Sequence, residues 1–145
     1  MNATMEKFCY PDTLIKEYLH WVVLLRPQQA TLGALVLACK DESDALSKIS
    51  QAAFSELAEI TAAIEKHLRG CFSYDKINYL LLMMVDKDVH FHVLPRYADV
   101  RHFERMAFKD PGWPGPPDLS WANETGDVIN PLLLRTLQRA FTAAT

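Results

Sequence analysis

The chain has 145 residues, half of them apolar and 23% charged, and it carries a net charge of −3. This composition is typical of one globular domain and excludes disordered, collagen-like and coiled-coil chains. The negative charge disfavours a nucleic acid polymer as partner, and the longest apolar run, residues 79–85, is much shorter than the roughly 18 residues that span a membrane.

The first forty residues predict a short helix and a pair of strands. Asp12 is a suitable N-cap for a helix over residues 13–19, so we expect an N-terminal helical extension over residues 1–19. Residues 21–25 (WVVLL) and 32–39 (LGALVLAC) are apolar runs of strand length. The six residues between them suit a hairpin, which predicts that the two strands pair antiparallel.

Residues 50–69 predict the main helix of the domain. Ser50 is a suitable N-cap, and Gly70 can end the helix in the left-handed conformation. We also expect an extra turn upstream, over residues 43–49. The apolar residues recur at spacings of four, three, four and four, which places them on one stripe of the helix: Ala53, Leu57, Ile60, Ile64 and Leu68.

Two further strands are expected over residues 76–85 and 88–94. The polar pair between them, Asp86 and Lys87, predicts a tight turn and therefore a second hairpin.

Residues 98–145 are expected to form a C-terminal loop and helix. The loop contains the proline- and glycine-rich residues 110–117 (DPGWPGPP), and the helix begins with Asn130 as N-cap and Pro131 at its first position. The whole chain then predicts a single α+β domain with a mostly antiparallel sheet of about five strands. We expect the main and C-terminal helices on one side of this sheet, which leaves the other side for a ligand or partner.

The candidate chemistry lies in residues 88–96 (DVHFHVLPR). Side chains alternate between the faces of a strand, so Asp88, His90 and His92 are expected on one face and the apolar residues between them on the core face. Alternate residues lie ~6.6–6.8 Å apart, a separation at which two imidazoles can flank one phosphate group. One histidine can then act as a neutral nucleophile while its neighbour carries a proton that offsets phosphate charge.

Two other interpretations of this histidine pair stay open at this point. A solvated strand face without function has the same pattern. A zinc or iron site is the other, but it needs a third ligand, and Asp88 would lie ~13 Å from His92 along the strand.

Residues 89–96 (VHFHVLPR) resemble the signature strand of the histidine-triad (HIT) superfamily, including the Pro-Arg that often follows it. The resemblance covers residues 20–97, because the first two strands resemble the first hairpin of that family and residues 57–68 resemble its central helix. It implies a HIT-like fold, a homodimer, and a nucleotide hydrolase or transferase.

The resemblance also implies roles for four residues. His90 corresponds to the middle histidine, which attacks the α-phosphorus of a nucleotide conjugate and forms a nucleotidyl-histidine that water resolves. His92 corresponds to the third histidine, which binds phosphate oxygens, and Asn78 to an asparagine that positions the phosphate or leaving group. Asp88 stands in place of the first histidine, so we expect it to orient the site or to modify the protonation of the leaving group.

Basic and aromatic residues add further candidates for substrate binding. Arg26 is near the place where the family commonly holds the ribose, and it is either a phosphate contact or an arginine in a solvated turn. Arg96 opens a basic stretch that ends at Lys109 and either neutralises a polyphosphate or forms a solvated face. Trp113 and Trp121 either stack on a base, cover a neighbouring subunit or seal the edge of the domain.

We therefore expect a hydrolase or transferase that acts on a dinucleoside polyphosphate or a nucleoside phosphoramidate. No cofactor is expected, although a divalent cation such as Mg²⁺ can accompany the substrate, and the expected partners are the small nucleotide and a second copy of the chain, without nucleic acid or membrane. A nucleotide-binding module with weak catalysis is the alternative, because residues 80–85 (LLLMMV) replace the glycine-rich turn of many HIT proteins. A metal-dependent enzyme built on His90 and His92 is the third hypothesis.

The cysteines and the start of the chain predict a cytoplasmic location. Cys9, Cys39 and Cys71 are odd in number and widely spaced, which is typical of reduced, packed thiols. Residues 1–10 contain charged side chains and lack the apolar segment of a secretory signal.

Overall fold

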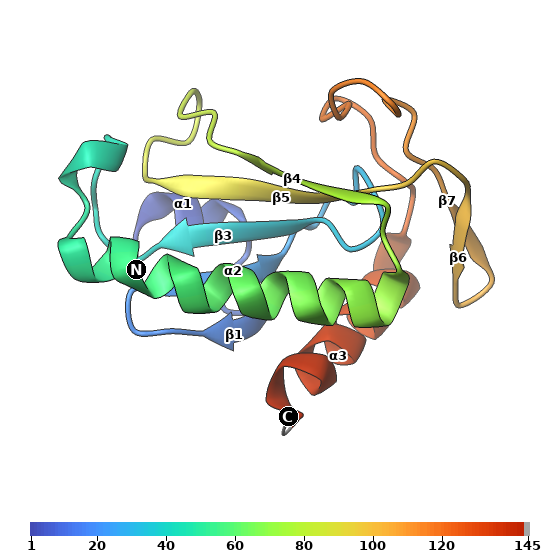
Figure 1. The fold of residues 1–145 in the computed structure, drawn as a ribbon, viewed down its shortest axis with the longest axis horizontal. Helices are drawn as coiled ribbons and strands as arrows, with labels where there is room; N and C mark the ends of the chain where they lie inside the picture. The colour runs from blue at the N-terminus through green and yellow to red at the C-terminus, as the bar shows by residue number, and fades with distance from the viewer. Residues whose placement is uncertain (144–145) are drawn as a thin grey trace.

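Five strands form one antiparallel sheet in the order β1-β2-β3-β5-β4 (Figure 1). The computed structural model describes residues 1–143, in which a separate two-stranded hairpin of β6 and β7 follows this sheet along the chain. The elements in chain order are α1 (Ala3–Lys7), β1 (Leu14–Glu17), β2 (Trp21–Leu25), β3 (Leu35–Cys39), η1 (Leu46–Lys48), α2 (Gln51–Phe72), β4 (Lys76–Leu80), β5 (His90–Arg96), β6 (Arg101–Phe103), β7 (Met106–Phe108) and α3 (Gly126–Thr142).

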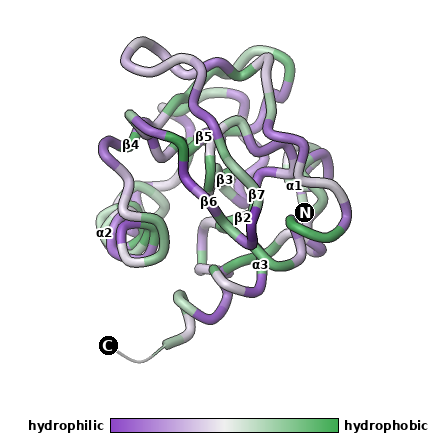
Figure 2. Tube along the Cα trace, turned by 90° about the vertical axis from the view of Figure 1, so that its right-hand side faces the viewer, coloured by the Kyte–Doolittle hydropathy of each residue, from purple (hydrophilic) through white to green (hydrophobic). Residues whose placement is uncertain are grey.

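Helices cover both faces of the sheet. Trp21 and Val23 of β2 belong to the core cluster that contains the buried stripes of α2 and α3, whereas Val22 and Leu24 belong to the cluster that contains α1. Figure 2 shows α2 on one side of the strands and α1 on the other. The predicted α+β architecture is confirmed, and the face expected to be free for a ligand is partly covered by α1.

The beginning of α2 matches the sequence prediction. The Oγ of Ser50 accepts a hydrogen bond from the N–H of Ala53 at 3.1 Å, and the predicted apolar stripe contributes four fully buried side chains. A short 3₁₀ turn, η1, precedes the helix, as expected. Neither α2 nor any other helix within residues 1–143 is long and apolar enough to cross a membrane.

The end of α2 differs from the prediction, because the helix continues through Gly70 to Phe72 and is capped by Ser73 in the left-handed region. The physical reason is that Phe72 extends the buried stripe. Gly33, with φ +83°, lies so close to Phe72 that a Cβ at this position would stand 2.8 Å from the Phe72 ring. Glycine is therefore required in the turn that joins β2 to β3.

The predicted helix over residues 13–19, and with it most of the helical extension, is wrong. Residues 14–17 form β1, which pairs with β2 and buries Ile15 against the core. Pairing with the open edge of β2 satisfies backbone groups and buries apolar surface, and this tertiary gain overrides the local helix signal. The N-terminal helix is instead α1, capped by Asn2, whose Oδ1 accepts from the N–H of Met5 at 2.9 Å.

The second predicted hairpin is also corrected. β4 ends at Leu80, which pairs with His92, and residues 81–89 form a long connection in place of a tight turn at Asp86 and Lys87. Asp88 is consequently outside the strand. Met84 and Val85, at the tip of the connection, are 81% and 87% exposed.

The C-terminal region contains more structure than predicted. The hairpin of β6 and β7 turns at Glu104 and Arg105, both with positive φ, a conformation that the sequence did not signal because neither residue is Gly or Asn. α3 begins at Gly126, so Asn130 is not its N-cap and Pro131 lies inside the helix. The side chain of Asn130 instead donates a hydrogen bond to the carbonyl of Pro27 at 2.9 Å and ties α3 to the β2–β3 turn.

Candidate active site

His90 and His92 lie on the same face of β5, below α1. Their ring centroids are 5.1 Å apart, and the ring of Phe8, at the end of α1, is 5.8 Å from each of them. Only 2% of His90 and 6% of His92 are exposed, while Phe91 packs on the opposite, core face. The predicted alternation along residues 90–93 is confirmed, and burial excludes the interpretation of a solvated strand face.

His90 is oriented by the backbone that precedes it. Its Nδ1 lies 2.6 Å from the carbonyl oxygen of Asp88. A carbonyl oxygen can only accept, so this hydrogen bond assigns the ring proton to Nδ1 and leaves Nε2 with a free electron pair. This is the tautomer that a nucleophilic histidine needs, and it is fixed before any substrate arrives.

His92 carries the opposite tautomer. The Nε of Arg26 donates to His92 Nδ1 at 3.4 Å, which leaves the ring proton on Nε2. Burial, then the positive charge of Arg26 and the neighbouring His90, lower the pKa of His92 to about 4. His92 is therefore a neutral hydrogen-bond donor at pH 7, and the expectation that the second imidazole carries a proton charge is corrected.

The positive charge at this site belongs to Arg26. Only 8% of Arg26 is exposed, its Nη1 donates to the carbonyl of Gln28 at 2.6 Å, and no carboxylate within residues 1–143 pairs with it. Burial lowers its pKa, but a guanidinium stays protonated in proteins. The interpretation of a solvated turn is wrong for Arg26, and a buried cation without a counter-charge attracts anions.

The two histidines and Arg26 line a cavity of about 260 Å³, whose walls also include residues 82–86, Leu119, Lys7, Phe8 and Gln28. Lys7 forms an ion pair with Asp86 at 3.0 Å, so the cavity has two cations and one carboxylate at its walls. A second hollow of about 200 Å³ shares Arg26 and Gln28 as well as Lys7 and Phe8. The two hollows share these four lining residues, and their volumes together fall in the range of a small-molecule site.

The carboxylate of Asp88 forms hydrogen bonds with α1 and none with either imidazole. Its Oδ2 accepts from the N–H and the hydroxyl of Thr4 at 3.3 and 3.1 Å, and its own N–H donates to the Thr4 hydroxyl at 3.2 Å. Asp88 thus orients His90 through its carbonyl and fastens α1 over the histidines through its carboxylate.

We expect Thr4→Val to destabilise the protein by about 1–3 kcal/mol, because it keeps the shape of Thr4 but removes the hydroxyl from a buried pair of hydrogen bonds. Thr4→Ser is the matched control, since it keeps the hydroxyl. Urea unfolding of both variants measures the difference. Equal stabilities of the Val and Ser variants would show that the link to Asp88 does not hold α1 in place.

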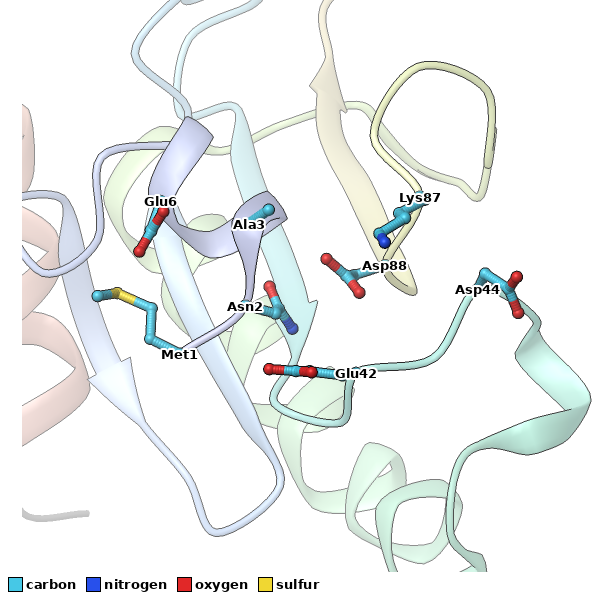
Figure 3. Close-up of a pocket in the computed structure, with 8 residues that line it drawn as sticks. All are labelled: Met1, Asn2, Ala3, Glu6, Glu42, Asp44, Lys87 and Asp88. Carbon is cyan, nitrogen blue, oxygen red and sulfur yellow. The ribbon is translucent and has the colours of Figure 1, made fainter.

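A larger hollow of about 480 Å³ lies on the other side of Asp88 (Figure 3). Four carboxylates line it, those of Glu6, Glu42, Asp44 and Asp88, beside the ammonium of Lys87. A phosphate within ~4 Å of one such carboxylate is repelled by a few kcal/mol at an effective dielectric constant near 20, so the charge of this hollow disfavours a phosphate ligand.

A metal site at His90 and His92 would need a third ligand, and the described part of the chain offers none. Within residues 1–143, no three His, Cys, Asp or Glu side chains are grouped closely enough to hold a metal ion. The charge of Arg26 beside His92 also opposes a second cation at this place.

Asn78 and Arg96 lie on the histidine face of the sheet but outside the histidine cavity. Asn78 pairs with Leu94 across the strands, and its Oδ1 accepts from Arg96 Nη1 at 2.7 Å. Arg96 also forms a bidentate ion pair with Asp110, at 2.7 and 3.0 Å. The structure therefore brings His90, His92 and Arg26 together and places Asn78 and Arg96 at a separate cavity.

Sequence reasoning missed Lys7, Phe8 and Gln28 as cavity residues. Lys7 and Phe8 reach the histidines only because α1 packs on this face of the sheet, a contact between segments more than 80 residues apart. Gln28 lies two residues after Arg26 in a turn that looked polar and solvated. The apolar pair Met5 and Phe8 was the one available signal that this segment is buried.

Comparison with known proteins identifies the fold. No protein-family model and no curated protein matches the chain. It is similar to the solved structure of a histidine triad (HIT) protein from Sinorhizobium meliloti, with a TM-score of 0.74, 16% identity, and 97% of this chain and 95% of that chain covered. It is also similar to a histidine triad protein from Marinobacter aquaeolei, with a TM-score of 0.71 and 18% identity. That match covers 88% of this chain and 87% of that chain.

A hypothetical histidine triad nucleotide-binding protein from Sulfolobus tokodaii is also similar, with a TM-score of 0.65, 14% identity, and coverage of 89% of this chain and 83% of that chain. At these low identities the similarity establishes a shared fold. The chain has the fold of histidine-triad proteins, which confirms the resemblance that residues 89–96 indicated.

Proposed function

We propose that the chain is a hydrolase or transferase that acts on the α-phosphate of a small nucleotide conjugate through a nucleotidyl-His90 intermediate. The observation that carries the proposal is the pair of opposite tautomers in one cavity. His90 offers an electron pair at Nε2, and His92 offers a proton at Nε2. The Sulfolobus neighbour, described as nucleotide-binding, is consistent with the substrate class.

The first chemical step forms a bond between His90 Nε2 and the α-phosphorus. The bond from phosphorus to the leaving group breaks, and the leaving group departs with that electron pair and takes up a proton from solvent. The Nδ1–H of His90 stays bonded to the Asp88 carbonyl, which offsets the positive charge that develops on the imidazole.

In the second step water attacks the same phosphorus, or an acceptor alcohol does so in a transferase. The N–P bond breaks, its electron pair returns to Nε2, and the attacking oxygen loses its proton to solvent. This route divides one displacement into two easier ones, because an imidazole is both a good nucleophile and a good leaving group.

Arg26 and His92 are suited to hold the phosphate through both steps. The guanidinium carries charge without a carboxylate partner in residues 1–143, and the neutral His92 donates a hydrogen bond from Nε2–H without the cost of burying a second cation. Donors already aimed at the phosphate oxygens stabilise negative charge as it develops. Lys7, on α1, adds a cation on the side of Asp86.

A nucleotide-binding module with little turnover is the second candidate, and one observation favours it. His90 is only 2% exposed. Arg26 and Lys7 at the cavity walls can hold a phosphate, whereas attack on phosphorus also needs contact with the buried Nε2 of His90, so a nucleotide can bind without being hydrolysed.

The deciding experiment combines intact-protein mass spectrometry with calorimetry. We expect a nucleotidyl adduct on His90 after brief mixing with diadenosine tetraphosphate or adenosine 5′-phosphoramidate, and this adduct should be stable in base and labile in acid. Calorimetric binding of AMP without adduct or turnover would establish the binding module instead. Failure of AMP and both conjugates to bind would contradict both candidates.

A further inference from the structure

Two links join α1 to residues 81–89, the connection between β4 and β5. The inner link is the buried hydrogen bonding between Thr4 and Asp88. The outer link is an ion pair in which Lys7 Nζ lies 3.0 Å from both carboxylate oxygens of Asp86. The Lys7 side chain is 51% exposed and the Asp86 side chain 17%, so water reaches this pair. An exposed ion pair contributes little to stability, and it can open without unfolding the protein.

Lys7 and Asp86 both line the histidine cavity, although the family resemblance assigns a role to neither. The ring of Phe8, the residue after Lys7, lies 5.8 Å from both imidazoles. Burial is the largest cause of the low pKa of His92, but the charges of the ion pair also act on it, since Asp86 raises that pKa and Lys7 lowers it. Both charges are therefore within electrostatic range of the place where a phosphate would be held.

The two cations of the cavity differ in how firmly they are held. The guanidinium of Arg26 is buried, and its Nε and Nη1 donate to His92 and to the carbonyl of Gln28. The ammonium of Lys7 is at the end of a flexible four-carbon chain and carries three donors that can turn to a new acceptor. Lys7 is therefore the cation that a carboxylate neutralises and also the one that can move.

A nucleotide phosphate is a stronger acceptor for Lys7 than the carboxylate of Asp86. A phosphate monoester carries a charge of about −1.5 to −2 at pH 7 and three acceptor oxygens, whereas a carboxylate carries a single charge and two oxygens. Asp86 also repels a phosphate that enters the cavity, because both groups are anions. Asp86 thus occupies Lys7 in the way that a phosphate would, and it opposes the phosphate directly as well.

We propose that Lys7 is a phosphate-binding residue of the histidine cavity and that Asp86 competes with the phosphate for it, an inference that rests on the proposed function and adds a control of its binding step. When a nucleotide binds, the Lys7 ammonium moves from the Asp86 carboxylate to the phosphate, and no covalent bond changes. Lys7 therefore strengthens phosphate binding and Asp86 weakens it, although the two residues are partners in one ion pair.

The test uses the opposite signs of the two effects on AMP binding, which calorimetry measures. Lys7→Met should weaken AMP binding about 3- to 5-fold and Asp86→Asn should strengthen it by a similar factor, as expected for one exposed charge pair. Lys7→Arg should keep the affinity close to that of the original chain, because it keeps the charge. Lys66→Met and Glu59→Gln remove the same charges from exposed positions on α2, on the opposite face of the sheet, and should leave AMP affinity unchanged.

A merely structural role of the ion pair gives a different result. Both substitutions break the same pair, so if the pair only held α1 in place, Lys7→Met and Asp86→Asn would shift AMP affinity in the same direction, and that outcome would refute the proposal. Unchanged affinity in either variant would refute it too, because Lys7 would then not reach the phosphate or Asp86 would not compete for it. In these cases AMP binding to the original chain still supports the proposed function. Failure of the original chain to bind AMP or either nucleotide conjugate would refute the proposed function itself.

Discussion

His90→Asn should lower kcat for nucleotide-conjugate hydrolysis by on the order of 10³-fold or more, because an amide has no electron pair comparable to that of imidazole Nε2. The substitution removes the nucleophile and keeps a polar side chain near the Asp88 carbonyl, which otherwise loses its hydrogen-bond donor. The adduct detected by mass spectrometry should disappear, while AMP binding should persist, since Arg26 and His92 are unchanged.

The measurement needs a check on folding, because His90 is buried and an unsatisfied Asp88 carbonyl costs about 1–3 kcal/mol. Thermal unfolding of the variant provides that check. His102→Asn is the matched control, since His102 is an exposed histidine on β6 outside the cavity. Hydrolysis that survives in a folded His90→Asn protein would exclude the covalent mechanism and move the chemistry to a direct attack by water.

The elements that the sequence predicted well are those with a strong local period. The stripe of α2 recurs every three or four residues over more than five turns, and the runs of β2 and β3 are continuous and apolar, so their burial follows from pattern alone. The alternation through His90 and His92 is similarly local. In each case, neighbours within a few residues determine which face is buried.

The wrong predictions have tertiary causes. Residues 14–17 have enough helix signal for a short helix, but β2 offers an edge to pair with. Asp88 has the right spacing for the face of His90, but Thr4, 84 residues away, draws it out of the strand. Asn78 was expected to position the phosphate, but it pairs with Leu94 and lines a cavity separate from the histidines. Contacts between residues so far apart in the sequence cannot be predicted from the pattern of any short segment.

Arg26 shows most clearly why local sequence could not predict the whole site. Beside Pro27 in a polar turn it looks solvated, but Gln29 is fully buried beneath that turn and holds it inward. The Gln29 side chain donates to the carbonyls of Arg26 and Ala34 and accepts from the N–H of Gly33, at 2.8 to 2.9 Å. This buried amide turns Arg26 toward His92. The homodimer and the cytoplasmic location stay predictions.

Arg26→Met should weaken AMP binding roughly 10- to 100-fold, because hydrogen bonds to charged groups contribute about 1.5–3 kcal/mol and Met keeps the apolar stem without the charge. Arg135→Met, at an exposed arginine on α3, controls for a general change in net charge. Calorimetry measures both variants. Unchanged affinity in Arg26→Met would mean that the phosphate is held elsewhere, for instance by Lys7.

The same variant also changes the titration of His92. The charge of Arg26 helps to lower the pKa of His92 to about 4, so Arg26→Met should raise that pKa, while burial still keeps it below the usual 6.5. A depressed pKa means that the unfolded chain binds the proton first, so stability is present above pH 6.5 and is lost as pH falls toward 4, by up to about 3 kcal/mol. In Arg26→Met this loss of stability should be smaller, because the pKa of His92 in the folded protein then lies closer to its pKa in the unfolded chain. Imidazole NMR measures the titration midpoint of His92, and urea unfolding between pH 7 and 4 measures the loss of stability. An unchanged midpoint in Arg26→Met would show that the guanidinium charge does not act on His92.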